Sequence, residues 1–402
     1  MRIWGPLLLL ATFLFTPTNS YASATDEVIA ALKAQVEALN ARLAALEAET
    51  TEIKTITVAA KPAAPVDKKT AGCCGDNITL KGDFRYRHEA FDVDNRRDRH
   101  RQRMRARVSA TGKVSDTVTA GFGLATGGSD PISTNQTFGD ASSSKGVVID
   151  LAYITWKTPV EGLEVRAGKF KNPLHRAGGH GLVWDGDLNP EGLGLTYKKG
   201  ALFANALGSW VDESSSDDDT FLIGGQFGVK QGAGDNGAIV AGIGYYNYLD
   251  AEGEPAFFDG SAMGNRLNPD GTYVSGFEII EGFVEYAADL NDGKLTLFAD
   301  YVQNLDADDF DQGWAAGAKF KKDKWQVGYT YQELEADAVL GTFSDSDFIG
   351  GGTDGEGHIL SAGYSISKSI SLKGTLFLND RNIDFGTEEE YKRLMLDISF
   401  KY

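Results

Sequence analysis

The feature that most limits the fold of this chain is a repeated alternation of apolar and polar residues after position 78. In the clearest case, Ile370, Leu372, Leu376 and Leu378 share one face of an extended chain, and polar residues such as Lys373 occupy the other. A period of two predicts β-strands with one apolar and one polar face. The alternating segments are about ten residues long, which is the length that a tilted strand needs to cross a membrane.

The connections between these segments alternate in length. We predict about sixteen strands, at 78–91, 98–112, 116–127, 147–158, 161–170, 191–200, 201–211, 219–230, 237–249, 275–289, 294–304, 312–322, 323–334, 358–368, 369–380 and 390–402. The connections after even-numbered strands are tight, whereas most of those after odd-numbered strands are longer and polar. This sorting, with an even strand count, is typical of outer-membrane barrels. The expected fold is therefore all-β: a transmembrane antiparallel β-barrel over residues 78–402.

The first 22 residues indicate export. Arg2 precedes an apolar core from Leu7 to Phe15, and small residues, Ser20 and Ala22, stand where a signal peptidase reads the chain. We predict a secretory signal peptide over residues 1–22. A membrane anchor is the alternative, but the apolar run is far shorter than the ~20 residues of a spanning helix. No 18-residue apolar stretch follows. A membrane-spanning chain of this kind must therefore form a closed barrel, which satisfies its backbone hydrogen bonds.

Residues 23–57 show a different period. Apolar residues recur at alternating spacings of three and four, which gives roughly four heptads and predicts a short α-helical coiled coil in the periplasm. The predicted seam consists of Ile29, Leu32, Val36, Leu39, Leu43, Leu46 and Ile53. A single amphipathic helix lying on the barrel is the alternative, but the narrow seam favours self-association.

Residues 58–77 form a predicted linker between the coil and the barrel. Pro62 and Pro65 end the helix and stiffen this segment. Cys73 and Cys74 are adjacent, which strains a bridge between them. They could link chains of an oligomer in an oxidising periplasm or remain free, and the sequence leaves both states open.

The C-terminal strand carries a resemblance to known proteins. Leu394, Leu396, Ile398, Phe400 and Tyr402 alternate with Met395, Asp397, Ser399 and Lys401. A last strand that ends in an aromatic residue resembles the signal read by the barrel assembly machinery, here Leu396, Ile398, Phe400 and Tyr402. This layout, with the stretch Gly168, Lys169, Phe170, Lys171, Asn172 and Pro173, resembles bacterial porins akin to the phosphate-selective porins. The resemblance implies a sixteen-stranded barrel that assembles as a homotrimer in the outer membrane.

Basic residues concentrate on one face of the first two predicted strands. Arginine occupies every second position from Arg99 to Arg107, and the opposite face carries Met104, Ala106, Val108 and Ala110. Because alternate residues share a face, these cations should line the lumen while the opposite face meets lipid. The arginine wall so predicted comprises Lys81, Arg85, Arg87, Arg101, Arg103, Arg105 and Arg107.

Acidic residues are expected to face the arginine wall. In general porins, the loop that corresponds to the connection 171–190, between the fifth and sixth predicted strands, folds into the barrel and narrows it. By this resemblance Asp185, Asp187 and the nearby Glu191 would oppose the arginines. Glu281, Glu285 and Asp300 occupy the polar face of strands about half a barrel away. Opposed walls of fixed charge would sieve polar solutes by their field.

The predicted function is an outer-membrane channel for passive diffusion of ions and small polar solutes. A net charge of −18 disfavours a nucleic-acid partner. None of the five His shows metal-ligand spacing, no nucleophile motif is found, and no cofactor is expected. Two alternatives are a structural tether, with the coil reaching peptidoglycan, and a barrel enzyme whose catalytic residues meet only in the fold. The preferred solute and the sign of ion selectivity stay open.

Overall fold

In this computed structural model, residues 77–215, 219–234 and 236–402 are described. The predicted signal peptide, the coiled coil, nearly all of the linker, and both cysteines lie outside these residues. Within them, sixteen long antiparallel strands form one closed sheet, joined by the two-residue strand β4. The prediction of about sixteen strands is confirmed, and each predicted range matches a strand to within three residues at either end.

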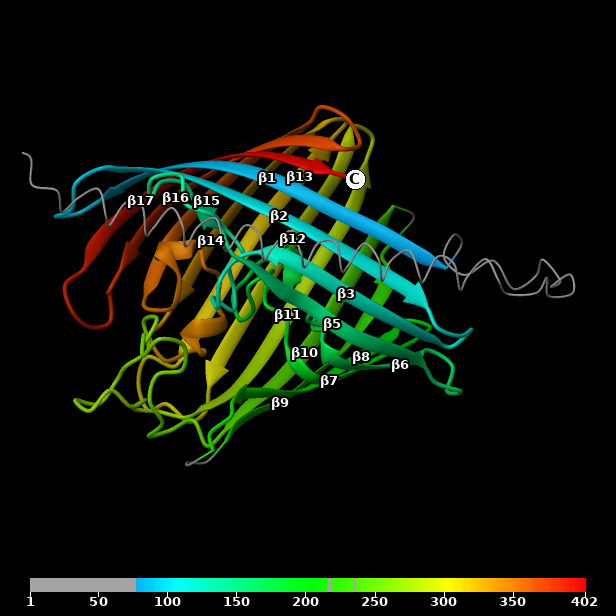
Figure 1. The fold of residues 1–402 in the computed structure, drawn as a ribbon, viewed down its shortest axis with the longest axis horizontal. Helices are drawn as coiled ribbons and strands as arrows, with labels where there is room; N and C mark the ends of the chain where they lie inside the picture. The colour runs from blue at the N-terminus through cyan, green and yellow to red at the C-terminus, as the bar shows by residue number, and fades with distance from the viewer. Residues whose placement is uncertain (1–76, 216–218, 235) are drawn as a thin grey trace, which may run out of the picture. The chain divides into compact units, whose positions relative to one another are not determined.

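The strands follow one another around the barrel in chain order (Figure 1). They are β1 (Ile78–Val93), β2 (Arg99–Lys113), β3 (Val118–Thr126), β4 (Gln136–Thr137), β5 (Val147–Lys157), β6 (Leu163–Lys169), β7 (Glu191–Lys199), β8 (Leu202–Asp212), β9 (Thr220–Gly232), β10 (Gly237–Leu249), β11 (Phe277–Leu290), β12 (Gly293–Asn304), β13 (Gln312–Lys322), β14 (Trp325–Leu334), β15 (Gly355–Ser365), β16 (Ile370–Arg381) and β17 (Glu389–Lys401). The strand β4 continues the position of β3 along β2.

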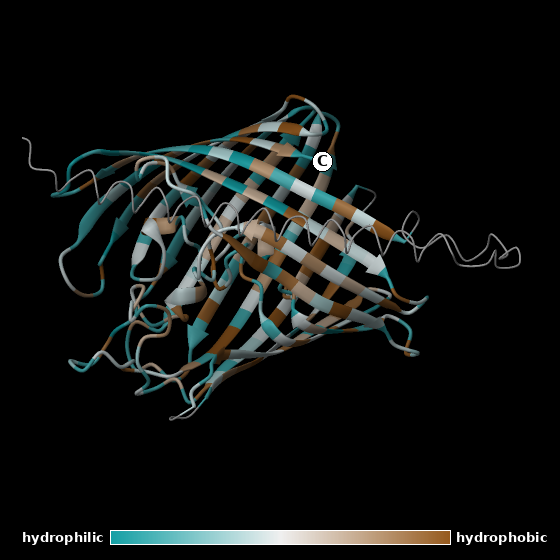
Figure 2. Ribbon diagram, in the orientation of Figure 1, coloured by the Kyte–Doolittle hydropathy of each residue, from teal (hydrophilic) through white to brown (hydrophobic). Residues whose placement is uncertain are grey.

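Apolar side chains cover the outer face of the barrel. Ile243, Leu193 and Val284 are 66%, 56% and 44% exposed, a pattern that suits contact with lipid rather than water. Figure 2 shows polar and apolar residues alternating along the strands, as a period of two requires. Among the residues that the structure describes, no helix combines the length and the apolar character needed to cross a membrane.

The first and last strands close the barrel. β1 pairs with β17 from Asp83 opposite Lys401 to Val93 opposite Tyr391. At the end of this seam, Gly82 and Tyr402 exchange backbone hydrogen bonds of 3.0 and 3.1 Å. The Tyr402 ring occupies the space that a side chain at Gly82 would take, so a larger residue there would displace the ring.

The long connections fold into the barrel from one end. Loops 170–190, 250–276 and 335–354 contribute Trp184, Tyr273 and Leu340 to one buried apolar cluster, which packs against Tyr246 on the inner face of β10. The short 3₁₀ helices of these loops are η1 (Ala177–Gly179), η2 (Gly341–Phe343) and η3 (Phe348–Gly350). These loops therefore fill part of the lumen.

Candidate functional site

The inner face of β1, β2 and β17 gathers charged side chains in rows. Register sets Arg85 opposite Arg105 and Arg87 opposite Arg103. Like charges directly opposite each other destabilise a sheet unless other groups compensate them. Carboxylates from the same strands and from two inward loops provide this compensation, and they decide the geometry of the site.

The row of charges that contains Arg87 is more buried than the row that contains Arg105. The Arg87 guanidinium, 4% exposed, donates two hydrogen bonds to Asp397 on β17, at 2.7 and 3.0 Å. It also reaches Asp347 of loop 335–354 at 3.1 Å. Arg393 on β17 binds the same Asp347 at 2.9 Å and pairs with Glu89 on β1. Loop 335–354 is thus fixed to the wall by a carboxylate that two arginines share.

The row at Arg105 binds the other inward loop. Asp187 of loop 170–190 accepts from Arg105 at 2.8 Å and from Arg107 at 2.9 Å. Both arginines also contact Asp83 on β1, at 3.3 and 2.9 Å. Burial raises the pKa of the Asp187 carboxyl, but the two arginines outweigh burial and lower it below its ordinary value.

The two loops meet at a pair of acidic residues. Asp185 accepts hydrogen bonds from the backbone N–H groups of Asp187, at 2.7 Å, and Ser346, at 2.9 Å. Burial, with the nearby charge of Asp345, raises the pKa of Asp185 to about 7. Burial, with the charge of Asp347, raises the pKa of Asp345 to about 6. These two carboxyls therefore change charge close to neutral pH.

Two guanidiniums of the wall lack a close carboxylate. In the described part of the chain, the hydrogen-bond partner of the Arg85 side chain is the Asn135 amide oxygen, at 2.6 Å. Arg103 reaches Ser133 at 3.5 Å and Glu89 only at 4.0 Å. Both partners from loop 127–146 are neutral. Positive charge is therefore left uncompensated at the middle of the wall.

A central cavity of about 240 Å³ lies between the wall and the two loops, lined by Arg85, Arg105, Asn135, Asp187 and Asp347 among others. A cavity of about 1010 Å³ opens on the tight-turn side and is lined by Arg166, His175 and Lys230 among others. A third cavity lies on the long-loop side. Of these three cavities, the one between the paired charges has the smallest volume.

The structure places three predicted acidic residues differently from the expectation. Glu191 shares the outward face of β7 with Leu193, and it pairs with Lys169 at 2.7 Å instead of facing the lumen. Glu281 and Asp300 point inward but are only 5% and 4% exposed. Loop 170–190 packs against β10–β13 and covers them, which the strand pattern could not reveal.

The remaining predicted residues occupy the lumenal side in different ways. Glu285 accepts a hydrogen bond from the Gly178 N–H at 2.8 Å and so anchors loop 170–190. Arg101 pairs with the buried Glu89. Lys81 is exposed towards the tight-turn end of β1. Leu396, Ile398 and Phe400 project from the outward face of β17.

Sequence reasoning missed several charged residues of the site. Arg393 and Asp397 lie on the inward face of the last strand, where its alternation could have marked them. Glu89 and Asp83 share the inward face of β1 with Arg85. Asp347 belongs to a loop, and nothing in its local sequence links it to Arg87, 260 residues away, or to Arg393, 46 residues away.

A family model described as "Putative porin" matches residues 75–266 and 307–402, more than half of the chain. The chain belongs to this family. The family and the barrel place this porin in the outer membrane and indicate a channel rather than an enzyme. A search of curated proteins finds no match.

The chain is similar to several solved porin structures. OprB of Pseudomonas putida is 11% identical, with 81% of this chain and 94% of that chain covered and a TM-score of 0.56. A loop-deleted OmpT of Vibrio cholerae is 15% identical, covering 81% and 100%, with a TM-score of 0.48. A mutant porin of Rh. blastica is 13% identical, covering 81% and 100%, with a TM-score of 0.47. At such identities the likeness to OprB supports a shared fold and nothing finer.

Proposed function

We propose that this porin forms a water-filled channel for passive diffusion of small polar solutes, and that its arginine wall makes it prefer anions. The observation that carries the proposal is the charge balance at the wall. Within the described residues, seven arginines (Arg85, Arg87, Arg101, Arg103, Arg105, Arg107 and Arg393) meet five paired carboxylates (Asp83, Glu89, Asp187, Asp347 and Asp397), which leaves two positive charges in excess. Fixed charge of one sign in a narrow pore favours the opposite ion.

Arg103→Ser combined with Arg105→Ser should shift permeability toward cations, because the two substitutions remove the excess charge. Arg107 still pairs with Asp83 and Asp187 when Arg105 is replaced, so we expect the variant to fold. The measurement is the reversal potential across a planar bilayer in a potassium chloride gradient. Lys113→Ser with Lys199→Ser is the matched control, since both residues are exposed and lie at the tight-turn ends of their strands. A folded Arg103/Arg105 variant with unchanged reversal potential and conductance would contradict the proposal.

The anion preference should weaken as the pH rises from 5 to 9. Asp185 and Asp345 have pKa values raised to about 7 and about 6, so both are protonated at pH 5 and ionised at pH 9. Two added negative charges beside the wall would offset its excess of positive charge. Reversal potentials measured across this pH range test the idea. Asp185→Asn with Asp345→Asn should keep the low-pH selectivity at pH 9, and an equal pH response in this variant would refute the assignment.

We also propose a homotrimeric barrel with its N-terminal coil in the periplasm. The signal peptide, the heptad seam of residues 23–57 and the aromatic last strand support this arrangement. The start of the first strand and the end of the last strand lie on the side of the tight turns, which is the periplasmic side in outer-membrane barrels. A tether to peptidoglycan through the coil is compatible with the channel and adds to it.

A further inference from the structure

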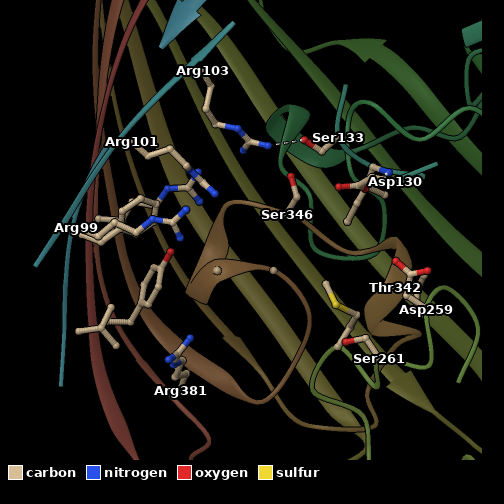
Figure 3. Close-up of a pocket in the computed structure, with 18 of the residues that line it drawn as sticks. Arg99, Arg101, Arg103, Asp130, Ser133, Asp259, Ser261, Thr342, Ser346 and Arg381 are labelled. Atoms are coloured by element: carbon tan, nitrogen blue, oxygen red, sulfur yellow. Dashed lines mark hydrogen bonds between the residues drawn. The ribbon is translucent and has the colours of Figure 1, made fainter. Parts of the chain in front are cut away.

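The cavity on the long-loop side combines apolar and basic walls. It measures about 450 Å³ and lies between the loop ends of β1, β2 and β17 and the loops 127–146, 250–276 and 335–354. Figure 3 shows Arg99, Arg101 and Arg103 on one side of it and Asp130, Ser133 and Asp259 on the other. A volume of this size suits a small organic molecule, since ligand sites occupy roughly 300–1,000 Å³.

Aromatic and aliphatic side chains on the inward face of the strands form one wall of this cavity. Phe91 and Val93 continue the inward row of β1, and Tyr391 begins that of β17. Three guanidinium groups stand over the Phe91 ring: Arg99 at 5.9 Å, Arg101 at 5.0 Å and Arg393 at 5.1 Å from its centroid. A water-filled lumen for inorganic ions alone has no need of apolar residues on this face.

The basic groups around the cavity differ in how they are compensated. Arg101 and Arg393 share Glu89, and Arg381 binds Glu389 at 2.6 Å. In contrast, Arg97 and Arg99 form no ion pair with any residue that the structure describes. Arg99 therefore presents a guanidinium that is stacked on an aromatic ring and free to bind a carboxylate through two hydrogen bonds.

We infer that this cavity is a binding site for aromatic monocarboxylates, which it captures before they enter the central cavity. The carboxylate would bind Arg99, with Arg103 nearby, and the ring would lie against Phe91 and Val93. The inference rests on the proposed function, because it names a solute class for the same channel. It differs from general anion preference in requiring both a charge and a ring.

Isothermal titration of the folded full-length protein with benzoate tests the site. Acetate carries the charge without the ring, and benzamide carries the ring without the charge. We expect benzoate to bind at least about tenfold more tightly than either, because benzamide lacks the charge that Arg99 would bind and acetate lacks the ring that would be buried against Phe91. Equal affinity for benzoate and benzamide, or for benzoate and acetate, would overturn the inference.

Two variants locate the binding. Arg99→Gln should weaken benzoate binding about tenfold, and Phe91→Leu should do so by removing the ring on which Arg99, Arg101 and Arg393 stand. Arg166→Gln is the matched control, because Arg166 lines the cavity on the tight-turn side and pairs with Glu164 at 3.6 Å. Unchanged affinity in either folded variant would overturn the site.

The reversal potential in potassium chloride separates this inference from the proposed function. If the channel prefers anions but binds benzoate no better than acetate, the proposed function is supported and the inference is contradicted. If the channel has no anion preference but still binds benzoate, and Arg99→Gln weakens that binding, the binding site is supported and the selectivity proposal is contradicted.

Discussion

Arg87→Met should destabilise the folded barrel by about 3–5 kcal/mol, whereas Arg85→Met should change its stability little. Arg87 is buried and compensates both Asp347 and Asp397. Removing one partner of a buried ion pair leaves the other charge without compensation, which costs about this much. Arg85 has an amide as its partner and stands opposite Arg105, so its loss also relieves like-charge repulsion.

Urea unfolding of the protein in lipid vesicles, followed by tryptophan fluorescence, measures both effects. The two positions form a matched pair, because they lie two residues apart on the same face of β1. Methionine at each site keeps an unbranched apolar stem and removes the guanidinium group with its charge and hydrogen bonds. Equal loss of stability in the two variants would show that the ion pairs of Arg87 contribute no more to the stability of the barrel than the neutral contact of Arg85.

Trp184→Ala should release loop 170–190 from the barrel wall and raise the single-channel conductance. Trp184 is 1% exposed and packs edge-on against Tyr246, with ring centroids 5.0 Å apart. Truncating a buried Trp costs roughly 3–5 kcal/mol. The strands on either side hold only the ends of this loop, so the loss falls on the contacts that hold its middle part against the barrel.

Conductance in planar bilayers and limited proteolysis within residues 170–190 report on this release. Trp156→Ala is the control, since Trp156 is 45% exposed on the outward face of β5, whereas loop 170–190 lies inside the barrel. A protease-resistant loop with unchanged conductance in Trp184→Ala would mean that Asp187 and Glu285 suffice to hold it. Increased conductance in Trp156→Ala would indicate a general loss of barrel order.

Strand positions could be predicted from the sequence because a period of two is a local property. Each residue of β2, for example, reports its face through its immediate neighbours, and Arg103 lies between the outward-facing Met104 and Gln102. Glu191 shows where this reasoning needs care. It lies two residues before Leu193 in β7 and therefore shares its outward face, which could have been inferred from the sequence.

The inward loops could not be placed in this way. The contacts of Asp347 with Arg87 and Arg393 join a loop to the first and the last strand of the barrel. Such contacts between distant residues leave no periodic pattern in the sequence. The same holds for Asp300 and Glu281, which point inward as their strands require. Loop 170–190 covers them, and its path depends on apolar packing against β10–β13.

The charges beside the pore also determine how the barrel closes. Arg87 on β1 stands directly opposite Asp397 on β17, while Ser399 and Met395 are the next inward residues on either side. A slip of one residue would turn every side chain of β17 to the other face. A slip of two would set Arg87 opposite Ser399 or Met395 and leave a buried carboxylate without its partner. The ion pairs therefore select a single alignment of the last strand, so substitutions at Arg87 or Asp397 should yield misaligned barrels during assembly as well as altered channels.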